Sequence, residues 1–143
     1  MTQIQRRIDR LILRLKQQYL LSDIRFVREY GNERVETPIR GLLAVISVVS
    51  TARDRGYLGG FLSSTVRGET YGAKLEIRVY APACENGNGL SEIVGDILSG
   101  LERADDEKII TAASATSIEF DPNMNAIYRT VQISIEFCVC EED

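Results

Sequence analysis

Residues 74–101 decide the fold and read KLEIRVYAPACENGNGLSEIVGDILSGL. Leu75, Ile77 and Val79 alternate with Glu76, Arg78 and Tyr80, and this period of two predicts a strand with one face in a core. Pro82 has no N–H group for a ladder hydrogen bond, so the strand is expected to end there. After a polar turn at residues 86–89, large apolar residues recur at the spacing of one helix face. They are Leu90, Ile93, Val94, Ile97, Leu98 and Leu101. The chain is therefore expected to form a strand, turn, and lay a helix back over the sheet.

The sequence after this helix predicts a terminal β-hairpin. Residues 109–120 form a run of small and β-branched residues that predicts a strand, and residues 121–125 predict a tight turn. From Tyr128 to Cys140 apolar and polar residues alternate over one long strand. The apolar face of this hairpin can receive the apolar face of the helix.

The sequence before residue 74 predicts a helix, two strands and a long connection. Residues 2–20 have the periodicity of a basic amphipathic helix, most often a surface helix with one face on the core. Residues 24–30 predict a short strand, and residues 42–49 predict a strand covered on both faces near the centre of the sheet. Residues 51–72 predict a long loop or an extended hairpin. Tyr57, Leu58, Phe61 and Leu62 in that segment are expected to contact another subunit. The segment 53–68 is expected to be mobile in an isolated subunit.

These elements predict an α+β fold in one domain over residues 1–143. The fold consists of a single, mostly antiparallel sheet with a covering helix and an N-terminal amphipathic helix. A chain of 143 residues with 44% hydrophobic content can bury one real core. The longest apolar run, residues 41–49, is shorter than the roughly 20 residues that span a bilayer, so a soluble, cytosolic protein is expected.

The charge is divided between the two halves of the chain. Residues 1–78 hold 14 Lys/Arg against 8 Asp/Glu, a balance of +6, whereas residues 79–143 hold 3 against 13, a balance of −10. Such halves can pair within one subunit or head to tail between copies. The candidate basic residues are Arg6, Arg10, Arg14, Arg53 and Arg55. The candidate acidic residues are Glu92, Asp96, Asp105, Asp106 and Glu107.

The sequence indicates no catalytic, metal or cofactor site, and we expect a protein that is not an enzyme. The chain has no histidine, which excludes Ser-His and Cys-His nucleophile pairs and the commonest metal ligand. Gly87-Asn88-Gly89 precedes a helix, but position 92 is Glu where a dinucleotide-binding turn needs Gly. The three cysteines form neither a disulfide framework nor a full zinc ligand set, and reduced thiols are expected.

The order of elements resembles that of the tail terminator, or tail-completion, proteins of long-tailed phages and related contractile particles. The resemblance is carried by residues 75–82 leading into the helix at 90–101, by residues 108–120, by the Asp121-Pro122 turn and by the strand at 128–140. It covers mainly residues 70–140 and implies a structural subunit of the virion tail or neck, present in the host cytoplasm during assembly. It further implies a ring, typically a hexamer, that ends the tail tube and meets tube or sheath proteins and neck proteins. No membrane, small-molecule substrate or direct nucleic-acid contact is expected.

Three other functions fit the same pattern. A head–tail connector or baseplate component would differ in the virion proteins that it binds. A small-ligand-binding regulatory domain would need a closed apolar pocket of at least about a few hundred Å³. A nucleic-acid-binding protein has only the basic N-terminal half in its favour, without a set of stacking aromatic residues on a strand face.

Overall fold

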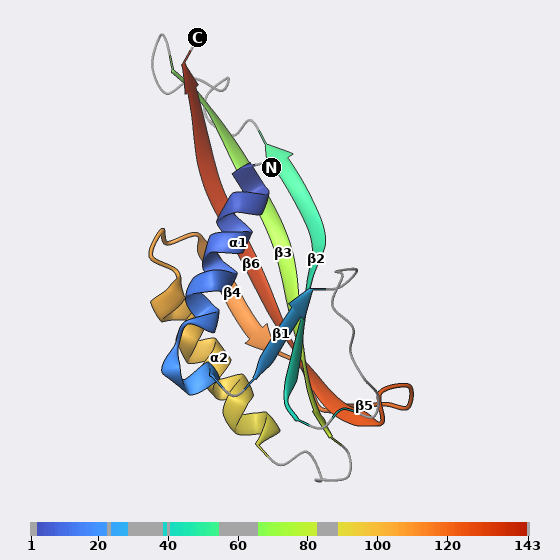
Figure 1. Cartoon of the computed structure of the whole chain (residues 1–143). Coiled ribbons are helices and arrows are strands. Elements are labelled where there is room, and N and C mark those ends of the chain that lie inside the picture. The colour runs from blue at the N-terminus through green and yellow to red at the C-terminus, as the bar shows by residue number, and fades with distance from the viewer. Residues whose placement is uncertain are drawn as a thin grey trace.

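A computed structural model describes residues 3–22, 24–28, 39, 41–54, 66–82 and 89–142. The helices are α1 (Gln3–Lys16), the 3-10 helix η1 (Tyr19–Leu21) and α2 (Leu90–Ala104). The strands are β1 (Arg25–Arg28), β2 (Leu43–Asp54), β3 (Val66–Pro82), β4 (Ile110–Ala115), β5 (Glu119–Asp121) and β6 (Ala126–Glu142). Figure 1 shows α1 and α2 on one face of the sheet.

The described strands form one sheet in the order β1-β2-β3-β6-β4, with β5 beside one end of β6. Every pairing is antiparallel except that of β1 with β2. The sequence prediction of an α+β fold with a mostly antiparallel sheet and a covering helix is therefore confirmed. β3 and β6, the two longest strands, pair from Val66 with Glu142 to Pro82 with Ala126. β3 ends at Pro82, as expected from its missing N–H group.

The core lies between the two helices and the face of the sheet beneath them. The alternating apolar residues of β3 and β6 point into it, as do the apolar faces of both helices. Its most buried large side chains include Leu15, Leu75, Ile77, Val79, Val94, Ile97 and Val131. A second, smaller cluster lies on the opposite face of the sheet and consists of Val27, Ile39, Leu43, Tyr80 and Ala126.

The two helices approach closely at Gly100. The Gln18 Nε2 donates a hydrogen bond of 2.6 Å to the Gly100 carbonyl oxygen. A Cβ at position 100 would lie 2.7 Å from the Gln18 Oε1 and 3.2 Å from the Leu15 Cδ1. Glycine at this position therefore allows α1 to pack against α2.

The prediction that residues 42–49 form a central strand covered on both faces is wrong. β1 pairs only with residues 43–46 of β2, so β2 lies next to the margin of the sheet. Val48 and Val49 are 49% and 54% exposed. Runs of apolar, β-branched residues occur both in strands that are buried on two faces and in strands that are only partly covered. Composition does not distinguish these two cases, which explains the error.

Two other predicted segments have different bounds in the structure. The predicted strand at 109–120 is divided into β4 and β5 by residues 116–118. There the Thr116 carbonyl oxygen accepts a hydrogen bond of 2.8 Å from the Arg129 Nε. In the segment 51–72, β2 continues to Asp54 and β3 begins at Val66, so both flanks of an extended hairpin are present. The predicted contact residues Arg55, Tyr57, Leu58, Phe61 and Leu62 lie outside the described residues.

Candidate functional site

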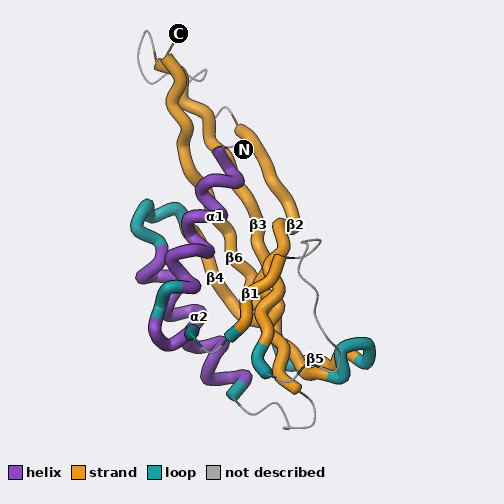
Figure 2. The backbone as a smooth tube through the Cα atoms, viewed as in Figure 1, coloured by secondary structure: helices purple, strands orange, loops and turns teal. Residues whose placement is uncertain are grey.

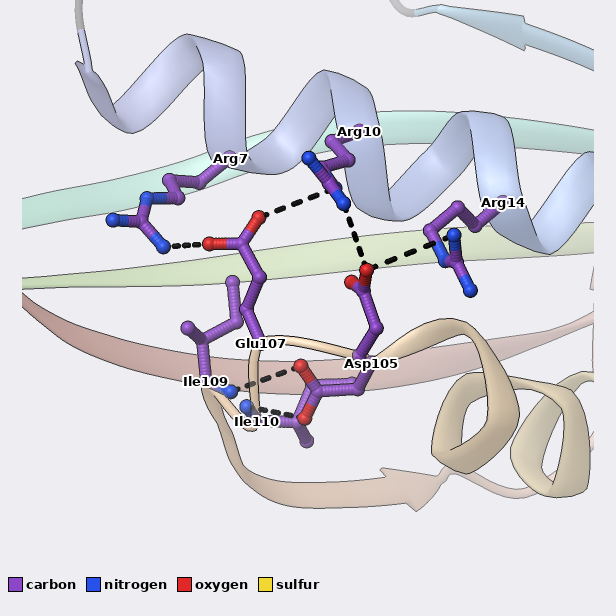
Figure 3. Close-up of polar contacts among 8 residues, drawn as sticks. Arg7, Arg10, Arg14, Asp105, Glu107, Ile109 and Ile110 are labelled. Carbon is purple, nitrogen blue, oxygen red and sulfur yellow. Dashed lines mark hydrogen bonds and ion pairs between the residues drawn. The ribbon is translucent and has the colours of Figure 1, made fainter.

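Three arginines of α1 meet carboxylates in the turn between α2 and β4 (Figure 3). The residues of this arginine–carboxylate cluster are Arg7, Arg10, Arg14, Asp106 and Glu107. The arginines share one face of α1 because they are spaced at i, i+3 and i+7. Arg7 pairs with Glu107. The Arg10 Nη2 lies 2.8 Å from the Asp106 Oδ2, and its Nε lies 3.4 Å from the Glu107 Oε1. The Arg14 Nη1 lies 3.6 Å from the Asp106 Oδ2.

The cluster shows one of the two arrangements that the charge division allows. Arg10, Arg14, Asp106 and Glu107 pair within one subunit. Their side chains keep between 24% and 57% of their surface exposed, so solvent screens these ion pairs and each contributes little to stability. The cluster therefore orients α1 against the turn, while burial of apolar side chains in the core provides most of the free energy that holds α1 on the sheet.

Asp105 is not a surface residue, contrary to the sequence prediction that it contacts a partner. It is 8% exposed, and its two carboxylate oxygens accept hydrogen bonds from the backbone N–H groups of Ile109 and Ile110, each at 2.9 Å. These bonds reverse the chain between α2 and β4, where Lys108 adopts a φ of 57°. An aspartate directly after a helix and before a strand was the available signal, because its side chain commonly binds nearby backbone N–H groups.

The ion pairs of Asp106 predict a dependence on acid pH. The side-chain hydrogen bond from Arg10 lowers the pKa of Asp106 below its ordinary value of 3.8. A carboxyl group with a lowered pKa in the folded protein stabilises it above the unfolded pKa, and this contribution is lost as the pH falls through the folded pKa. The contribution of Asp106 is therefore expected to be lost only below about pH 4.

An NMR titration of the carboxyl carbons measures this effect directly. Arg10→Gln is expected to raise the pKa of Asp106, since it removes the hydrogen-bond donor. Arg6→Gln is the matched control, because Arg6 is an exposed residue of α1 that forms no ion pair with Asp106. An equal change in both variants would show that the net charge of α1, rather than the Arg10 contact, sets the pKa.

The other sequence candidates do not join this cluster. Glu92 is exposed and Asp96 is half-buried, and both lie in the first half of α2. Arg53 is near the end of β2, where it pairs with Tyr71 of β3 in the ladder. The structure therefore separates the predicted acidic patch into a turn that contacts α1 and a pair of residues on the surface of α2.

A long arm of the sheet extends past the helical layer. Figures 1 and 2 show β3 and β6 continuing beyond the N-terminal end of α1, with β2 beside β3 for part of the way. Phe137 of β6 lies beneath the N-terminal part of α1. Its ring lies 5.1 Å from the Arg7 guanidinium and stacks on the Tyr71 ring at 5.9 Å. The distal arm is defined as the part of the sheet beyond the row of Tyr71 and Phe137, which comprises Asp54 of β2, residues 66–70 of β3 and residues 138–142 of β6.

An aromatic pair, which the sequence prediction missed, lies on the face of the sheet opposite the helices. The rings of Tyr80 and Tyr128 are 5.2 Å apart, and the Arg78 guanidinium lies 5.3 Å from the Tyr128 ring. Ladder pairing brings the two tyrosines together across β3 and β6. Tyr80 is only 5% exposed, so this pair packs the smaller cluster and does not offer two open rings for stacking on a base.

A surface hollow lies where α1, η1 and α2 meet. Its volume is about 460 Å³, and its lining consists of Arg14, Gln17, Gln18, Tyr19, Leu20, Arg103 and Ala104. Most of these side chains are charged or carry an amide. The hollow does not match the closed apolar pocket that the regulatory-domain alternative requires.

Two further features of the described residues bear on the class of protein. Helices α1 and α2, as far as the structure describes them, are too short or too polar to cross a membrane. In the same part of the chain, no three Cys, Asp or Glu side chains gather in a way that could hold a metal ion.

Comparison with known proteins does not assign the chain to a family. No protein-family model matches it, and no curated protein matches its sequence. The function is therefore argued from the geometry of the sheet and helices.

Proposed function

We propose that the chain is a structural subunit of a phage or phage-like tail. Copies of it form a ring that ends the tail tube and joins it to the neck or head side. The observation that carries this proposal is the distal arm, in which paired strands extend past the helices that cover the rest of the sheet.

The arm needs a partner for physical reasons. A ribbon of two or three strands is marginally stable in water unless it packs on another layer. Beyond the row of Tyr71 and Phe137, five further residue pairs of β3 and β6 continue along the arm, from Thr70 with Cys138 to Val66 with Glu142. At about 3.3 Å per residue, these rows extend for roughly 16 Å. A neighbouring subunit or the end of a tube can supply the missing layer.

The order of elements supports the same proposal. A strand that ends at Pro82, a covering helix at 90–104 and a hairpin formed by β4, β5 and β6 are the elements on which the tail-terminator resemblance rests. We propose no catalytic role and no cofactor for the chain. Its partners would be copies of itself, tail-tube or sheath proteins, and neck proteins, and its place would be the tail or neck of the virion. A head–tail connector or baseplate component is the alternative, and it differs in the virion proteins that it binds.

Electron microscopy and sedimentation of the purified full-length chain test the proposal. Rings with one fixed subunit number, six in the simplest case, are expected at micromolar concentrations or on addition of tail-tube ends. Because the arginine–carboxylate cluster is satisfied within the subunit, the rings are expected to persist when the salt concentration rises. A chain that stays monomeric at high micromolar concentration, with and without tube ends, would contradict the proposal, and so would a two-fold symmetric dimer.

A further inference from the structure

We infer that neighbouring subunits join through two different apolar surfaces, one on the helices and one on the margin of the sheet. The residues of the first surface, the corner patch, are Leu13, Tyr19 and Leu20 of α1 and η1. Those of the second, the margin patch, are Ala113, Ile118 and Phe120 of β4, β5 and the segment between them. The inference rests on the proposed ring and identifies the contact that would close it.

The margin patch is a part of the sheet that the helices leave uncovered. Ala113 pairs with Ile133 and Phe120 pairs with Ile127, and both partners pack in or against the core beneath the helices. Residues opposite each other in a ladder share a face, so Ala113 and Phe120 also point to the helical side. Ala113 is nevertheless exposed, and Ile118 and Phe120 are 55% and 56% exposed. The helical layer therefore ends before it covers this margin.

The backbone at this margin is open as well. Among the described residues, β4 pairs only with β6, so the backbone groups on its other side have no strand partner. No charged residue and no proline occurs from Ile110 to Ala115. Soluble proteins usually protect such an edge with charge, proline or a covering element. A covering element from a second subunit would supply this protection.

The corner patch of the same chain cannot serve as this cover. Helix α1 lies on the β1 side of the helical layer, where the Lys16 Nζ is 5.9 Å from the centre of the Phe26 ring and Asp9 pairs with Arg28. Helix α2 contacts β4 on the other side and packs against α1 through Gly100. Because α2 stands between the two patches, only a second copy can bring them together.

The flank of α2 beside the margin patch leaves room for a partner. With about 3.6 residues per turn, Ser91, Gly95 and Glu102 point away from Gly100 and hence away from α1. All three are exposed, and a Cβ at position 95 would meet no atom within 4 Å. A side chain from a second copy can therefore lie against both α2 and the margin patch.

The corner patch exposes more apolar surface than a free helix end requires. Tyr19 is 89% exposed, and Leu13 and Leu20 are 56% and 54% exposed. Tyr19 and Leu20 line the hollow where α1, η1 and α2 meet, and Leu13 lies one helical turn before Gln17 of the same lining. Exposed aromatic side chains bury large areas on binding and often contribute most of the affinity. Tyr19 is therefore the expected anchor of the contact.

Charged residues beside the two patches have opposite signs. The described lining of the hollow at the corner patch includes Arg14 and Arg103 but no carboxylate. Glu102 on the outer flank of α2 and Glu119 within the margin patch are both exposed, while Arg129 nearby already donates to a backbone carbonyl. Opposite charges steer and orient two surfaces as they meet. The occupant that fits the margin patch is therefore the corner patch of a second copy.

The two patches also lie at similar levels of the sheet. The ladder through β2 and β3 places Phe26, which lies near the C-terminal end of α1, level with Arg129 of β6. Arg129 follows Tyr128, the ladder partner of Glu119. A second copy placed beside the sheet without a shift along the strands would bring the end of its α1 level with the margin patch. Since the two surfaces differ, repetition of this contact closes into a ring when the rotation divides the circle.

A lysine in either patch tests the contact. Leu20→Lys and Ile118→Lys, each in the full chain, are expected to raise the concentration needed for ring formation at least about tenfold, because each buries an unpaired charge between subunits. Both side chains are more than half exposed in the subunit, so both variants are expected to fold. Val49→Lys is the matched control, since Val49 is 54% exposed on β2 and belongs to neither patch.

Mixing the two lysine variants tests whether the contact joins different surfaces. Leu20→Lys keeps an intact margin patch, and Ile118→Lys keeps an intact corner patch. An equimolar mixture is therefore expected to form a dimer with one copy of each variant and no ring. A mixture that stays monomeric at high micromolar concentration would overturn the contact, and so would dimers formed by either variant alone.

Photo-crosslinking locates the contact without disrupting it. Tyr19→benzoylphenylalanine, mixed with an isotope-labelled chain that is otherwise unmodified, is expected to form cross-links to residues 111–121 of the labelled copy. Cross-links confined to other segments, or rings that persist in both lysine variants, would overturn the contact and leave the proposed ring standing. A wild-type chain that forms no assembly at all would overturn both the contact and the proposed function.

Discussion

Leu15→Ala is expected to lower the free energy of unfolding by about 2–5 kcal/mol, the range for removing a fully buried leucine side chain. Leu15 is 1% exposed and lies where α1 meets α2, with its Cδ1 next to the Gly100 site. The loss should be large because Gly100 has no side chain that could move into the space left behind. Urea denaturation monitored by circular dichroism measures the change.

Leu13→Ala is the matched control for this prediction. It removes the same atoms from the same helix, but Leu13 is 56% exposed. The control is expected to change the free energy of unfolding by less than about 0.5 kcal/mol. Similar losses in the two variants would mean that helix propensity, rather than the contact between α1 and α2, sets the stability of this layer.

Asp105→Ala is expected to cost about 2–4 kcal/mol, because it leaves two backbone N–H groups without their acceptor. The N–H groups of Ile109 and Ile110 both donate to the Asp105 carboxylate, and Ile109 is buried. Asp105→Asn should cost less, since the amide keeps one of the two acceptor oxygens. Thermal and urea unfolding measure both variants.

Asp106→Ala separates the role of these hydrogen bonds from that of charge. It removes the neighbouring carboxylate, which is exposed and pairs with arginines of α1. Its effect on stability is expected to be much smaller than that of Asp105→Ala. Equal losses would show that the negative charge of the turn, rather than its hydrogen bonds to β4, stabilises this region.

The sequence predicted the elements whose apolar residues follow a regular period. β3, α2 and β6 each have one buried face and one more polar face, and α1 shows the same division around its axis. Periodicity reports this contrast directly, so the type and order of these elements could be predicted. The bounds were less accurate, since α2 continues to Ala104 and β6 begins at Ala126.

The sequence could not predict how distant segments meet. Whether the arginines of α1 pair with Asp106 within a subunit or between subunits depends on the packing of α1 beside α2, which no local pattern reports. In the same way, no local pattern reports that β1 pairs with residues 43–46 of β2. Asp105 and Asp106 are adjacent and chemically identical, yet one is buried and the other exposed, because only the turn geometry distinguishes them.

The packing of α1 has a consequence for the order of events during synthesis. Its apolar face packs against α2 and against strands of the sheet, and its arginines pair with residues 106 and 107. All of these partners except β1 and β2 leave the ribosome long after α1 does. At about 5–20 residues per second, the roughly 90 residues between α1 and the turn take about 5–20 s to translate. During this interval the nascent chain displays the apolar face of an amphipathic helix without its main partners, the kind of surface that chaperones bind.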